Sequence, residues 1–245
     1  SVSLTKIECE VPSELVNGKF NFDLEVRVTS YDGVSEWTKV ASLIQAAHID
    51  SDESYRKFAA NARTLTIKGF GFAAAPSHLN NTVYIRFPDS MGVEPYECRP
   101  LQNTTSTTII CNIDSDMPVG RLEATVALFG GYNTKRAVPN YKSIGEVVPA
   151  PTLNAGSLEL SPTDTSFYVT GTGFDTNSTY NVVTFRIGTN PITQGVVISG
   201  NDTYLLVSVP NGLGFTGDLY ATVIAYGGST NEARIGSVFT TPVTF

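Results

Sequence analysis

The sequence predicts an all-β protein of tandem immunoglobulin-like β-sandwiches, the N-terminal one incomplete. Apolar and polar residues alternate strictly over short segments, which is typical of strands with one face against a core. One pattern also recurs at residues 5–12 (TKIECEVP), 107–114 (TTIICNID) and 203–210 (TYLLVSVP), each followed by a glycine and a second alternating segment. The period of about 100 residues is the size of one β-sandwich domain.

The first element, residues 1–45, contains only the later strands of such a module. Five apolar residues line one face of its second strand and form a candidate assembly surface: Phe20, Phe22, Leu24, Val26 and Val28. Half a sandwich leaves this row without a partner sheet. We therefore expect upstream sequence or a neighbouring subunit to cover it.

Two complete modules follow, at residues 46–148 and 149–245. Each contains a strand that ends in Gly-x-Gly-Phe, RTLTIKGFGF at 63–72 and SFYVTGTGF at 166–174. We expect both glycines of each pair to supply positive φ angles at a tight bend, and the phenylalanine to close the end of the sandwich. A nucleotide-binding role for these glycines is not supported, because the third glycine of that fingerprint is missing and no helix follows.

The junctions between modules are short, VASLIQAAHI at 40–49 and EVVPAPTL at 146–153. Such short, proline-containing connections predict a stiff string of modules. The best helical candidate in the chain, SDESYRKFAANA at 51–62, is long enough for only a turn or two.

The order of these motifs resembles the IPT/TIG family of immunoglobulin-like domains. The shared features are the turn written IKGFGF in the first complete module and VTGTGF in the second, the IIC strand, and the final strand that ends in a glycine pair (LFGG and AYGG). The second module lacks both cysteines, and residues 1–45 carry only the last third of the pattern. The resemblance implies an early-type immunoglobulin sandwich, which occurs in cell-surface receptors, adhesion proteins and some transcription factors.

The resemblance also implies a disulfide between Cys98 and Cys111, which flank a loop in the first complete module. Closing a loop of about a dozen residues stabilises the fold by about 3 kcal/mol on the chain-entropy model. The alternative is a pair of buried thiols in a cytosolic protein. Cys9 takes the repeat position of Cys111, so its expected partner lies outside the chain or in a neighbouring subunit.

Four sequons, at Asn80, Asn103, Asn177 and Asn201, occupy matched positions in the two modules. Matched surface asparagines of this kind predict covalent N-glycans on an extracellular protein.

The sequence predicts no catalytic, cofactor or metal site. His48 and His78 are isolated, and the two Ile-Asp-Ser-Asp stretches at 49–52 and 113–116 lack the glycine and distal glutamate of an EF-hand loop. The net charge of −7 argues against a nucleic acid partner, and no apolar run is long enough for a membrane span.

These observations predict a non-catalytic extracellular structural or adhesive protein, a subunit or segment of a glycosylated surface filament. Its expected partners are copies of itself, joined head to tail. The alternative is a ligand-binding ectodomain segment of a cell-surface receptor. Tyr220 and Tyr226 point outward and are candidates for a contact surface, although single exposed aromatic residues are common on any protein.

Overall fold

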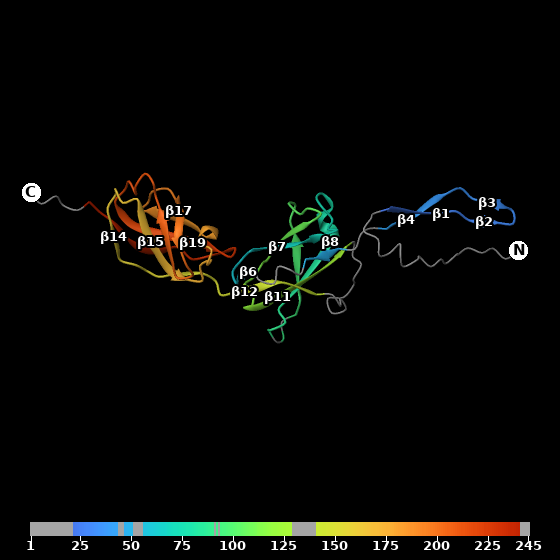
Figure 1. The fold of residues 1–245 in the computed structure, drawn as a ribbon, viewed down its shortest axis with the longest axis horizontal. Coiled ribbons are helices and arrows are strands. Elements are labelled where there is room, and N and C mark those ends of the chain that lie inside the picture. Colours follow the sequence, from blue (N-terminus) through green and yellow to red (C-terminus); the bar gives the residue numbers. More distant parts are fainter. Residues whose placement is uncertain are drawn as a thin grey trace, which may run out of the picture.

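The computed structural model describes residues 22–43, 47–50, 56–90, 92, 94–128 and 141–240. A β-hairpin and two β-sandwiches follow one another along the long axis of the molecule (Figure 1). The hairpin pairs β1 (Phe22–Val26) with β4 (Thr38–Leu43) in an antiparallel two-stranded sheet, and its tip pairs β2 (Thr29–Ser30) with β3 (Gly33–Val34).

The first sandwich contains eight strands in the sheet order β5-β7-β10-β9-β8-β11-β12-β6. Strand β9 pairs with both β8 and β10 and so joins the two layers. Strands β6 and β12 pair in parallel. The elements are β5 (His48–Ile49), β6 (Lys57–Ala59), β7 (Thr64–Phe70), the short helix η1 (Ser77–Asn80), β8 (Asn81–Arg86), β9 (Tyr96–Pro100), β10 (Thr108–Asn112), β11 (Gly120–Leu128) and β12 (Lys142–Val148).

The second sandwich repeats this topology in the order β13-β15-β18-β17-β16-β19-β21-β14, with β20 paired to β19. Its elements are β13 (Thr152–Leu153), β14 (Leu158–Leu160), β15 (Ser166–Thr172), η2 (Ser178–Tyr180), β16 (Val182–Ile187), β17 (Thr193–Gly200), β18 (Tyr204–Ser208), β19 (Gly217–Ala225), β20 (Gly228–Ser229) and β21 (Ala233–Val238). The repeated sequence pattern is thus a repeated topology, and the fold is a tandem array of immunoglobulin-like sandwiches.

The alternating apolar rows form the two cores, as the sequence predicts. On β18, Leu205 and Val207 are fully buried, and their repeat partners Ile109 and Cys111 on β10 are equally buried. Each core gathers the inward rows of both layers of its own sandwich. Burying one such aliphatic side chain contributes about 1.5–3 kcal/mol.

The two glycines of each Gly-x-Gly-Phe motif act differently, which corrects the expectation that both adopt positive φ. Gly173 does so, with φ of +74°, and Phe174 after it is buried. Gly171 is needed for another reason, because a Cβ there would overlap the carbonyl oxygen of Thr152 on the paired strand β13. The first sandwich repeats this arrangement at Gly69, Gly71, Phe72 and His48.

The helical candidate at 51–62 is wrong where the structure describes it. Residues 57–59 form β6 and a turn follows, closed by the Ala62 N–H donating to the Ala59 carbonyl at 2.9 Å. Parallel pairing with β12 and burial of Phe58 in the core outweigh the local helix propensity. Residues 51–55 lie outside the described residues.

Candidate assembly, disulfide and glycosylation sites

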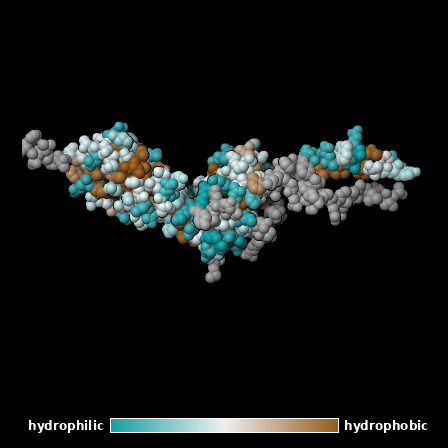
Figure 2. Space-filling view, in the orientation of Figure 1, coloured by the Kyte–Doolittle hydropathy of each residue, from teal (hydrophilic) through white to brown (hydrophobic). Residues whose placement is uncertain are grey.

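The candidate assembly surface lies on the N-terminal hairpin. Leu24 and Val26 of β1 are half-buried, and Val28 after them is 42% exposed. Val40 on the paired strand β4 is 57% exposed. Hydrophobic residues accordingly mark the surface of the hairpin in Figure 2. Phe20 lies outside the described residues, and Phe22 is placed in β1 by its backbone alone.

The contacts within the hairpin are those of a surface element. Lys39 pairs with Asp23 at 2.7 Å, and both side chains are about half exposed. The Arg27 guanidinium lies 4.9 Å from the centre of the Trp37 ring, yet Trp37 remains 61% exposed. An exposed ion pair and one cation–π contact are each worth about 1 kcal/mol or less, well below what a packed core supplies.

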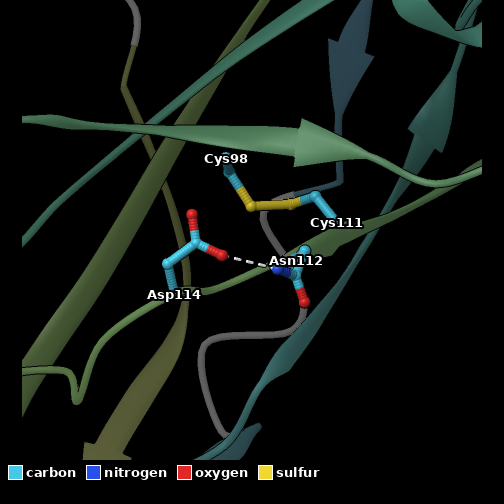
Figure 3. Close-up of a disulfide and its surroundings, with 4 residues drawn as sticks. All are labelled: Cys98, Cys111, Asn112 and Asp114. Atoms are coloured by element: carbon cyan, nitrogen blue, oxygen red, sulfur yellow. Dashed lines mark hydrogen bonds between the residues drawn. A yellow bond between two sulfur atoms is a disulfide. The ribbon is translucent and has the colours of Figure 1, made fainter.

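A disulfide joins Cys98 on β9 to Cys111 on β10 (Figure 3). Both residues are fully buried, and the bond closes a loop with a sequence separation of 13. Asn112, beside it, donates from Nδ2 to Asp114 Oδ1 at 2.6 Å. Because β9 pairs with both layers, the disulfide fixes the strand that connects them. Cys9 lies outside the described residues.

The second sandwich fills the disulfide position without a covalent bond. Gly195 stands in register where Cys98 stands in the first sandwich, and Val207 takes the place of Cys111. A Cβ on Gly195 would overlap Cγ1 of Val207. The valine side chain therefore occupies the space that two sulfur atoms fill in the first sandwich.

Three of the four predicted glycosylation asparagines are exposed: Asn103, Asn177 and Asn201. Asn80 is half-buried at the end of η1.

In two sequons the hydroxyl is already hydrogen-bonded to the asparagine. Thr179 Oγ1 donates to Asn177 Oδ1 at 2.8 Å, and Thr203 Oγ1 donates to Asn201 Oδ1 at 2.9 Å. These local turns present both asparagine side chains on the surface.

Sequence reasoning missed a pair of buried asparagines that organise the loop after each Gly-x-Gly-Phe motif. Asn181 Oδ1 accepts from the Asp175 N–H at 2.8 Å, and its Nδ2 donates to the carbonyls of Asp175 and Ser178. Asn81 makes the equivalent bonds to Ala73 and His78. An asparagine at the start of the same strand in both modules, the first residue of β8 and the residue before β16, is the signal that points to them.

Ion pairs brace the outer face of the second sandwich. Arg186 donates two hydrogen bonds to the Glu232 carboxylate, at 2.8 and 2.6 Å, and Arg234 donates one to Asp218 at 2.8 Å. The hydrogen bond from Arg186 lowers the pKa of Glu232. Hydrogen bonds from Arg234 and then Ser237 lower the pKa of Asp218.

Within the described ranges, no three metal-ligating side chains of His, Cys, Asp or Glu cluster together. In the same part of the chain, no helix has both the length and the apolar character to cross a bilayer.

No family model and no curated protein match the chain. Among solved structures it is similar to the full extracellular region of plexin A4 (TM-score 0.47, 16% identity, 84% of this chain and 17% of that one). It is also similar to a biofilm-associated protein BSP domain (TM-score 0.27, 17% identity, 82% of this chain and 30% of that one). A third similar structure is that of the chicken CNTN1 FN1–FN3 domains (TM-score 0.35, 12% identity, 88% of this chain and 76% of that one). The chain thus spans 17% of the plexin A4 structure and 30% of the biofilm-associated protein structure.

Proposed function

We propose that the chain is a non-catalytic extracellular structural or adhesive protein of IPT/TIG type, a subunit or segment of a glycosylated surface filament assembled head to tail. The observation that carries the proposal is the β1–β4 hairpin, a two-stranded sheet with apolar residues on its surface. A two-stranded sheet alone is marginally stable in water, so it needs further strands against it.

Strand addition from a neighbouring subunit meets this need. Among the described residues, β1 and β4 pair only with each other, and strand edges of this kind accept an added strand. The row of Leu24, Val26 and Val28 then gains a facing sheet. A contact between two different surfaces of one molecule propagates into a filament unless it closes into a ring.

The extracellular setting is supported by the buried Cys98–Cys111 disulfide, because such bonds persist in oxidising compartments. The exposed sequons at Asn103, Asn177 and Asn201 agree with it. The IPT/TIG assignment rests on the order of the sequence motifs, repeated in two modules.

The test is the mass distribution of the purified glycosylated protein by mass photometry, together with electron microscopy of the native material. Leu24→Asp places a charge in the proposed contact and is expected to abolish oligomers. Val34→Asp, at the exposed hairpin tip outside the row, is the control and is expected to leave them intact. Isolated monomers with a complete N-terminal module would end the filament proposal, as would oligomers that resist Leu24→Asp.

The alternative is a ligand-binding ectodomain segment of a cell-surface receptor. It is favoured by an uncharged face on β15, β18 and β17 of the second sandwich, where Tyr168, Val196 and Ile198 are each more than half exposed. The equivalent face of the first sandwich carries Lys68 and Arg99. The complete gene decides between the two, since a receptor requires a membrane-spanning segment that a secreted filament subunit lacks.

A further inference from the structure

The junction between the two sandwiches is bridged at two separate points. The first is the covalent connection at residues 149–151, whose Pro151 is buried. Its Cα lies 3.2 Å from where a Cβ on Gly173 would stand, so the connection packs against the second sandwich. A single tether of this kind still allows the modules to rotate about it.

The second point is the tip of the β19–β20 hairpin of the second sandwich, residues 226–229, which consists of a two-residue turn and the short strand β20. The Tyr226 carbonyl accepts a hydrogen bond from the Ala59 N–H of β6 at 2.9 Å. Asn61 Nδ2 donates to the Ser229 carbonyl at 2.7 Å. Ala59 is fully buried although it stands on a short strand at the end of its sheet. The second sandwich therefore supplies the hydrogen-bond acceptors for this end of the first.

The shapes of the two surfaces match closely. A Cβ on Gly228 would overlap Asn61 Oδ1 and Ala59 Cβ, and its three nearest atoms all belong to the first sandwich. Gly227 lies beside Ala62, which is fully buried as well. Only small residues on both sides allow the backbones to approach this far.

Tyr226 holds the hairpin in its docked conformation. Its φ of +51° is uncommon for a residue other than glycine, and Gly227 follows at +80°. The tyrosine hydroxyl accepts from the Thr176 N–H at 3.2 Å, and Lys57 Nζ lies 5.8 Å from the ring centre. The side chain is thus braced by its own sandwich and contacted by the other.

The docking surface is particular to the first sandwich. Repeat equivalence is set by matching hydrogen bonds, Met117 N–H to Ala60 O in one sandwich and Gly214 N–H to Pro162 O in the other. Ser161 therefore corresponds to Ala59, but its N–H donates to Asp164 of its own sandwich at 2.7 Å. The second sandwich satisfies this group internally and offers no equivalent donor.

We infer that residues 226–229 recognise residues 57–62 as an intramolecular docking pair, which makes the two sandwiches one rigid body with a fixed mutual orientation. The contacts are at two points far apart in sequence, so rotation about the connection at 149–151 breaks the hydrogen bonds of Ala59 and Asn61. This inference is independent of whether the chain forms filaments.

Residual dipolar couplings of the backbone amides in the full chain test the inference. A rigid pair fits one alignment tensor across both sandwiches. Gly228→Val directs its added methyl groups into Ala59 and Asn61, and is expected to require two tensors of different magnitude while each sandwich keeps its own amide shifts. Asn231→Val, an exposed position in the same loop, is the matched control and is expected to retain one tensor.

Asn61→Ala supplies a second variant on the other side of the contact, without any change to the second sandwich. It removes the bond to Ser229 and is expected to lower the agreement with a single tensor in the same direction as Gly228→Val. Two tensors in the unmodified chain, or one tensor in Gly228→Val, would overturn the inference.

Discussion

Removal of the Cys98–Cys111 disulfide is expected to destabilise the first sandwich selectively. The change is the double substitution Cys98→Ala and Cys111→Ala. With the sequence separation of 13, the chain-entropy relation gives a loss of about 3 kcal/mol in the free energy of unfolding. In urea this corresponds to a fall of roughly 1–3 M in the unfolding midpoint, for the m-values of small domains.

A second double variant separates the covalent constraint from packing. Cys98→Gly with Cys111→Val copies the solution of the second sandwich, where Gly195 and Val207 fill the same space. It restores buried volume but not the cross-link. Both variants are therefore expected to lose the constraint, and the alanine pair loses additional packing.

The assay is hydrogen exchange by mass spectrometry across a urea series, because it resolves peptides of each sandwich. Fluorescence does not serve, since the single tryptophan, Trp37, stands in the N-terminal hairpin. The second sandwich is the internal control. A change below about 0.5 kcal/mol in the first sandwich, the size of an ordinary surface substitution, would refute the reasoning, and so would an equal change in both sandwiches.

Three further predictions concern the second sandwich. Gly195→Ala is expected to lower the free energy of unfolding by about 1–3 kcal/mol, because the added methyl group overpacks against Val207. Val207→Ala, combined with it, is expected to reduce that loss. Additive losses in a double-mutant cycle measured by urea unfolding would contradict the contact. Asn181→Ala removes three hydrogen bonds and is expected to cost about 1–3 kcal/mol by thermal unfolding, with faster exchange confined to the loop before β16; a loss of stability without local exchange would argue against the loop-organising role. Because its partners lower the pKa of Asp218 in the folded state, the ion pair with Arg234 stabilises above the ordinary aspartate pKa of about 3.9 and is lost as the pH falls through the lowered value. Asp218→Asn is therefore expected to be less stable than the unmodified protein at pH 6, with the gap closing towards pH 2; a constant gap across this range speaks against the linkage.

The sequence alone predicts the two sandwiches, because apolar core residues alternate with polar residues at a period of two along their strands. Leu205 and Val207 are predicted inward and are fully buried, and Phe174 closes the end of its sandwich as expected. The same alternating pattern occurs in both modules at matched positions. Such a repeat is not expected from a chance alternation of apolar and polar residues. Within residues 1–45 the structure describes the β1–β4 pair, whereas the strand expected at 5–12 lies outside the described residues, so the incomplete module stays a prediction.

What the sequence did not predict depends on contacts between distant segments. Residues 57–59 have a helical composition, yet they pair with β12 and bury Phe58. Gly171 is needed because the backbone of the paired strand β13 approaches it closely, which no local pattern reveals. Ser229 and Asn61, which are hydrogen-bonded across the junction, lie 168 positions apart in the sequence. The sequence alone therefore indicated only that Tyr226, beside this contact, is an outward aromatic residue. Local propensity carries no information about such partners.

Each sandwich ends its sheet path with the two short halves of its own first strand, β5 and β6 in one case and β13 and β14 in the other. These halves are two or three residues long. A strand from another chain could form only a few backbone hydrogen bonds with strands this short. Very short edge strands are one way in which natural proteins discourage amyloid-like stacking. We therefore expect these short terminal strands to be poor templates for strand addition when neighbouring modules touch side by side.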